Sequence, residues 1–170
     1  VEVKFRNGWE VEFGYIDEFK LFEKEFRNDR AVLEVGWSNR RGRSIDVYAS
    51  RGVNFDSDLE IYGARAGWRV NDQLRFSYEL TKLELDPDPD DESTLIHVFE
   101  TLYSFNPNLF VKLFVQTNSV IDKENIQLLG VWRFKPPFGS LQVAYQRGTS
   151  DQGEQSQQGN SLFTKLSWVF

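Results

Sequence analysis

The chain has 170 residues, of which 15% are aromatic and 27% are charged, and its formal net charge at pH 7 is −6. This length is that of a single domain. The sequence has no cysteine, which excludes a disulfide framework and a cysteine-ligated metal site, and the acidic balance argues against a nucleic-acid partner.

Apolar and polar residues alternate almost everywhere, which predicts strands with one apolar and one polar face. Val1, Val3 and Phe5 alternate with charged residues, and Asn7-Gly8 then predicts a tight hairpin turn. The alternating segments cover residues 1–6, 9–15, 31–38, 45–50, 62–70, 74–81, 95–105, 109–118, 127–134, 141–146 and 161–170. We therefore expect about eleven strands and no helix, and no apolar run reaches the roughly 18 residues of a membrane-spanning helix.

The predicted connections alternate between short and long, with the stretch 27–30 departing from the trend. The short ones are 40–43, 71–72 and 106–108, and the long polar ones are 51–58, 86–93 and 148–160. Tight turns at one end and longer loops at the other are typical of a transmembrane β-barrel, whose strands need roughly 9–11 residues. The predicted fold is therefore all-β, an antiparallel up-and-down transmembrane β-barrel.

Large aromatic residues near the strand ends resemble the girdles that such barrels place at the membrane interfaces. They are Trp37, Trp68, Tyr103, Trp132 and Trp168. A soluble sandwich or a ligand-holding barrel also alternates, but its core would favour compact aliphatic side chains over aromatic strand tips.

One face of the predicted strands is expected to contact lipid and the other to line a polar lumen. The lipid-facing set includes Val11, Phe13, Leu33, Val35, Ala64, Phe76, Leu113, Val143 and Leu166. The lumen-facing set is Glu12, Glu34, Arg65, Arg69, Arg75, Glu79, Glu100, Lys112, Gln116 and Arg133. Mixed arginine and glutamate suit a salt-bridged, filled interior as well as a wet pore.

The last strand alternates up to its final residue, Phe170. Leu166, Trp168 and Phe170 resemble the C-terminal insertion signal of bacterial outer-membrane proteins, although Lys165 stands where that signal prefers glycine. This resemblance implies the outer membrane of a Gram-negative bacterium, a periplasmic C-terminus, contact with lipid and lipopolysaccharide, and recognition by the barrel-assembly machinery. Phe170 also fits a girdle position.

The second half of the chain resembles a known family. YSFNPNLF (Tyr103–Phe110), the pair Gln116 and Asn118, LQVAYQRG (Leu141–Gly148) and the terminal Lys165-Leu166 stretch resemble the C-terminal barrel of the DUF5916 family. Members are often named carbohydrate-binding family 9-like domain-containing proteins, but their sugar-binding-like β-domain has no counterpart in these 170 residues. The resemblance implies an outer-membrane barrel and assigns no carbohydrate site.

Residues 1–170 are predicted to be the C-terminal part of a larger barrel, with no second domain. Val1 is not a translation start, no signal peptide precedes it, and an odd strand count places it on the extracellular side, whereas single-chain bacterial barrels have even strand numbers. We expect another polypeptide, either an upstream fragment or a subunit, to complete the sheet. A hidden turn within residues 16–26 would change this parity.

Candidate chemistry is sparse, and we expect no cofactor, no catalytic residue and no metal-ligand set. His97 is the single histidine and falls in the lipid-facing register, although a protease site at the rim is a distant alternative. The acidic loop with Asp86, Asp88, Asp90 and Asp91 is read as a solvated loop or as a place for divalent ions next to lipopolysaccharide phosphates. Arg40–Arg43 would face anionic headgroups.

Three classes of function fit the sequence. The first is a channel or transport component with a polar, porin-like lumen. The second is a membrane anchor or scaffold that holds a periplasmic domain or the partners of a protein complex. The third and most distant is an outer-membrane enzyme.

Overall fold

The computed structural model describes residues 1–22, 24–87, 93–120, 123–149 and 158–169. The strands of this part of the chain are β1 (Glu2–Lys4), β2 (Trp9–Phe22), β3 (Lys24–Ser38), β4 (Arg43–Asn54), β5 (Ser57–Arg69), β6 (Leu74–Asp86), β7 (Thr94–Asn106), β8 (Leu109–Asn118), β9 (Lys123–Lys135), β10 (Gly139–Thr149) and β11 (Gln158–Trp168). The expected count of about eleven strands is thereby confirmed.

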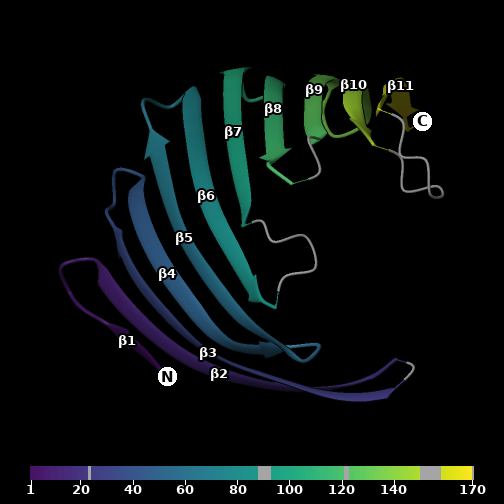
Figure 1. Ribbon diagram of the computed structural model, residues 1–170. Coiled ribbons are helices and arrows are strands. Elements are labelled where there is room, and N and C mark those ends of the chain that lie inside the picture. Colours follow the sequence, from purple (N-terminus) through teal and green to yellow (C-terminus); the bar gives the residue numbers. More distant parts are fainter. Residues whose placement is uncertain (23, 88–92, 121–122, 150–157, 170) are drawn as a thin grey trace. The chain divides into compact units, whose positions relative to one another are not determined.

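The strands form one antiparallel, up-and-down sheet in which each strand pairs with the next along the chain (Figure 1). The all-β class and the meander connectivity are as predicted. The order is linear, beginning with β1 and ending with β11, and the described strands are not closed into a barrel. In the part of the chain that is described, no helix is long and apolar enough to cross a membrane.

Two compact units make up the chain. The first unit comprises Val1–Gly67 and Glu79–Ile96, and the second unit comprises Trp68–Tyr78 and His97–Phe170. Each unit is a stretch of antiparallel sheet with its own pair of faces.

Two predicted connections were wrong because strands continue through them. Residues 27–30 lie inside β3, where Asp29 stands opposite Asp17 of β2. Residues 51–58 are not a long loop, since β4 ends at Asn54 and β5 begins at Ser57. The intervening Phe55 and Asp56 make a two-residue turn with φ angles of 50° and 67°.

That turn is held by side chains of another hairpin. The Phe55 backbone N–H donates to Asn28 Oδ1 at 2.9 Å, and the Phe55 ring packs edge-on against Phe26 at 4.9 Å between centroids. Positive φ is unfavourable for a bulky residue. These contacts with β3 supply the compensation that the local sequence lacks.

The first unit separates apolar from charged side chains by strand register. Rows of directly opposed residues on β2, β3 and β4 form its apolar face: Trp9, Trp37 and Ile45; Val11, Val35 and Val47; Phe13, Leu33 and Ala49. The alternate residues form its polar face, where Glu12, Glu34 and Tyr48 make one row. The alternation read from the sequence therefore becomes two chemically distinct surfaces.

The second unit shows the same division in β8 to β11. Its apolar face has rows such as Leu113, Leu128, Tyr145 and Leu162, with Leu141 opposite Leu166. Its polar face is more mixed, because a row through Lys112 also contains Leu129, Ala144 and Phe163.

The described sheet has almost no buried core. Leu59 and Val131 are the buried hydrophobic residues in the part of the chain that is described, at 5% and 6% exposure. In contrast, Phe13 on the apolar face of the first unit is 52% exposed, and Leu166 of the second unit is 67% exposed. A soluble domain would bury such side chains against a second layer.

Candidate functional site

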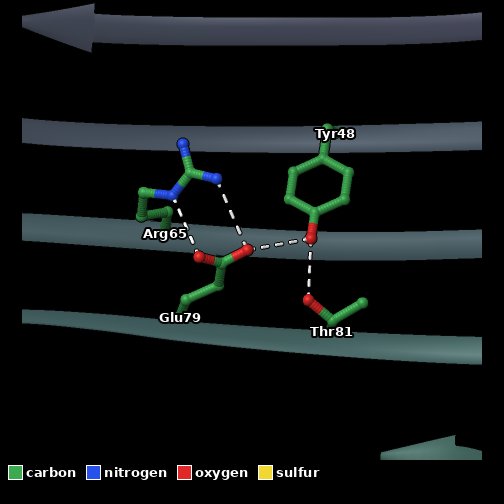
Figure 2. A network of polar contacts seen from close by, with 4 residues as sticks. All are labelled: Tyr48, Arg65, Glu79 and Thr81. Carbon is green, nitrogen blue, oxygen red and sulfur yellow. Dashed lines mark hydrogen bonds and ion pairs between the residues drawn. The ribbon is translucent and has the colours of Figure 1, made fainter. Parts of the chain in front are cut away.

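The polar face of the first unit carries a side-chain network that spans three strands (Figure 2). Tyr48 of β4 reaches across β5 to β6, where its hydroxyl donates to Glu79 Oε1 at 3.1 Å and lies 2.7 Å from Thr81 Oγ1. Arg65 of β5 donates to the same carboxylate, from Nε to Oε2 at 3.2 Å and from its terminal nitrogen to Oε1 at 3.4 Å.

Gly63 makes this reach possible. It lies on β5 beneath the Tyr48 ring, and a Cβ at residue 63 would overlap with ring carbons and the hydroxyl of Tyr48. Glycine inside a strand often marks a place where another group approaches the backbone closely. The pairing of Tyr48 with Gly63 thus lets an aromatic ring lie flat over one strand and bond to the next.

The Arg65–Glu79 pair fixes the geometry of the network more than it stabilises the fold. The two side chains are 45% and 28% exposed, and partly exposed ion pairs contribute about 1 kcal/mol or less to the free energy of unfolding. Two parallel N–H···O bonds do, however, hold the planar guanidinium and carboxylate in one orientation.

An acidic surface adjoins this network. Glu12 stands opposite both Glu2 and Glu34, and Asp46 stands opposite Gly36. A cleft of about 120 Å³ lies here, lined by Glu10, Glu12, Glu34 and Asp46 together with Gly8, Gly36, Trp37 and Ser38. Like charges directly opposed in a sheet are destabilising, so the row of Glu2, Glu12 and Glu34 lowers the stability of the sheet. A surface with only a structural role would avoid this cost.

Lys4 partly neutralises the acidic surface, since its Nζ lies 2.6 Å from Glu2 Oε1 and 3.4 Å from Glu10 Oε1. The described residues include no group of three or more histidine or acidic side chains arranged to hold a metal ion. A clustered negative surface of this kind raises the local concentration of cations.

Several predicted lumen residues are brought into contact. In the first unit Glu12 faces Glu34, and Arg65 pairs with Glu79. In the second unit Lys112 Nζ lies 3.2 Å from Glu100 Oε2.

The other predicted lumen residues belong to the second unit, and each has a different neighbour. Arg69 pairs with Asp72 at 2.7 Å, and the Arg133 guanidinium lies over the Phe110 ring at 5.7 Å. Gln116 stands opposite Asn125. The Arg75 carbonyl oxygen accepts a hydrogen bond from Thr101 Oγ1 at 3.0 Å.

Tyr48, Gly63 and Thr81 were not predicted from the sequence as members of the network. The available signal was an aromatic residue in the polar register of one strand with a glycine inside the next. Only the register between strands shows that the ring and the glycine meet.

The proposed C-terminal signal lies on the apolar face of the second unit. Leu166 faces Leu141, and the Trp168 ring lies 5.3 Å from Phe134 between centroids, with Lys135 Nζ 5.4 Å from its ring centre. Phe170 lies outside the described residues.

The remaining candidates are more isolated. His97 Nδ1 lies 2.6 Å from the Tyr78 hydroxyl, on the face that also carries Phe76. Asp86 is the last residue of β6, and the predicted ion ligands Asp88, Asp90 and Asp91 lie outside the described residues.

Comparisons with protein-family models and with curated proteins find no match to this chain. The resemblance to the DUF5916 barrel stays a prediction.

Proposed function

We propose that this chain forms part of the wall of a bacterial outer-membrane β-barrel, and that its polar face lines the lumen of a channel or transport component. The observation that carries this proposal is the exposed apolar face. Large hydrophobic residues stand on one side of a single-layer sheet while charged residues occupy the other. A lipid environment accommodates that face without a second protein layer.

The border of the apolar face in the first unit supports a membrane position. Tyr15 donates to Asp29 Oδ2 at 2.9 Å, and Tyr62 donates to Glu60 Oε2 at 2.7 Å. Arg51 lies in the same row as Tyr15, because both stand opposite Ala31. Its Nε forms an ion pair with Glu60 Oε1 at 3.2 Å. Tyrosines with an apolar body and a hydrogen-bonded tip are characteristic of membrane interfaces.

The two sheet edges require partners in a membrane. β1 and β11 stand at the ends of the strand order, and unpaired N–H and C=O groups in hydrocarbon each cost several kcal/mol. We propose that strands of another polypeptide pair with these edges, because single-chain bacterial barrels have even strand numbers. The predicted relation to the DUF5916 barrel is consistent with this arrangement.

The anchor or scaffold function is the second candidate, and the cross-braced polar face favours it. Tyr48, Arg65, Glu79 and Thr81 tie three strands together, and Lys112 is tied to Glu100. Side chains that bond to one another across the polar face would fill part of a lumen. A membrane anchor needs a rigid sheet of this kind, and it does not need an open pore.

Conductance across planar lipid bilayers distinguishes these two functions. The chain is purified from outer membranes together with any strands paired to it. A channel gives stepwise, cation-selective conductance, because the surface around Glu12, Glu34 and Asp46 is acidic. Glu34→Gln should lower the cation selectivity, whereas Val35→Ala, on the opposite face, should leave it unchanged. Conductance no greater than that of protein-free bilayers would reject the channel and leave the anchor.

A further inference from the structure

A groove of about 340 Å³ lies on the polar face of the first unit, at the end away from the acidic cleft. Its volume falls in the range of small-molecule pockets, roughly 300–1,000 Å³. Apolar side chains of β2, β5 and β6 contribute to its lining, namely Ile16, Leu59, Ile61 and Leu83. Leu59 is 5% exposed, so this part of the polar face has a packed, apolar floor.

One wall of the groove is held rigidly. Asn28 lines this wall and is 6% exposed. Its Nδ2 donates to Asn54 Oδ1 at 3.3 Å, and its Oδ1 accepts a hydrogen bond from the Phe55 N–H. This arrangement also places the Asn54 side chain on the wall, where its amide nitrogen has no hydrogen-bond partner among the residues described.

Arg30 supplies an unpaired positive charge. It lines the groove opposite Ile16 on β2 and Gly52 on β4, and it makes no ion pair within the described part of the chain. The other charged lining residues are Lys20 and Glu18, which lie 3.4 Å apart and pair with each other, and Asp29, whose carboxylate accepts a hydrogen bond from the Tyr15 hydroxyl. Among the described residues that line the groove, Arg30 is therefore the cation without an ion-pair partner.

Gly52 lets the backbones of β3 and β4 approach closely beside Arg30. A Cβ at residue 52 would overlap with the backbone carbonyl oxygen of Asp29 and lie 2.7 Å from Arg30 Cβ, so no larger residue fits there. A guanidinium offers two parallel donors to a carboxylate. The Arg30 guanidinium next to an apolar floor suits a ligand that has an anionic head and an apolar body.

We propose that this groove binds a small organic carboxylate with an apolar body. Arg30 and the Asn54 amide nitrogen bind the carboxylate, and the hydrocarbon part lies on Ile16, Leu59, Ile61 and Leu83. The proposal does not depend on the channel function, because every group belongs to the first unit and no barrel closure is required.

The test is a ligand-observed NMR titration of hexanoate against the full chain in lipid nanodiscs, with empty nanodiscs as the blank. Hexanoate should bind saturably, while acetate, which lacks the apolar body, and hexylammonium, which has the opposite charge, should not compete. Arg30→Gln should weaken hexanoate binding by about tenfold or more, since it removes the charge that pairs with the carboxylate.

Arg27→Gln is the matched control. Arg27 lies on the same strand but stands opposite Phe19, on the face away from the groove, so its loss should leave hexanoate affinity unchanged. Equal weakening by both variants would overturn the proposal, as would the absence of saturable hexanoate binding. Hexan-1-ol bound as tightly as hexanoate, with no effect of Arg30→Gln, would show an apolar site without anion recognition and would also reject it.

Discussion

The ring of Tyr48 lies over Gly63 and bonds through its hydroxyl to Glu79 and Thr81 on the strand beyond. An added methyl group at residue 63 would overlap with that ring, and the ring is held in place by its hydrogen bonds. Any relief of the overlap therefore breaks part of the network.

Gly63→Ala is expected to lower the free energy of unfolding by about 1–3 kcal/mol, the usual cost of overpacking. Gly14→Ala is the matched control, because a Cβ there would make an ordinary contact, 3.9 Å from Val32 Cβ. Urea unfolding in lipid vesicles, followed by tryptophan fluorescence, measures both variants. Equal stability of the two variants would show that the ring moves aside without loss.

Leu113→Arg is expected to cost about 2–4 kcal/mol, because Leu113 lies on the proposed lipid-facing side near the middle of β8. Lys112→Gln, at the adjacent position on the other face, loses only a partly exposed ion pair with Glu100 and should cost about 1 kcal/mol or less. The same unfolding assay compares them. A smaller loss for Leu113→Arg than for Lys112→Gln would contradict the assignment of faces.

Replacing Trp168 and Phe170 by serine is expected to reduce the amount of protein in the outer membrane while leaving synthesis unchanged. The reason is the proposed recognition of this aromatic pair by the assembly machinery. Quantitative immunoblots of outer-membrane and whole-cell fractions measure the effect. Lys165→Gln, on the other face of β11, serves as the control, and normal membrane levels of the serine variant would leave only a girdle role for the pair.

The strands were predictable because a period of two is a local property. Val11, Glu12 and Phe13 reveal a two-faced strand without reference to any other segment, and the expected strand count agrees with the structure. The alternation also predicted the division of side chains between faces in the first unit, as in the opposed pairs Val11–Val35 and Glu12–Glu34.

Features that depend on contacts between strands were not predictable. The turn at Phe55-Asp56 has neither glycine nor asparagine, and its support comes from Asn28 and Phe26 of another hairpin. Tyr48 and Glu79 are 31 positions apart, and only the pairing of three strands brings them together. The groove at Arg30 likewise collects residues from β2 to β6, each of which looks ordinary in its own strand.

We propose that one face of the sheet contacts lipid and the other contacts water. Glu34 and Val35 are neighbours on β3 with opposite orientations, and the chain has no native cysteine, so single-cysteine variants at these positions need no background mutation. Each variant is treated in intact outer membranes with a charged, membrane-impermeant maleimide. We expect rapid labelling of Glu34→Cys and protection of Val35→Cys. Labelling of Val35→Cys as fast as that of Glu34→Cys would show that the two faces are not divided between lipid and water.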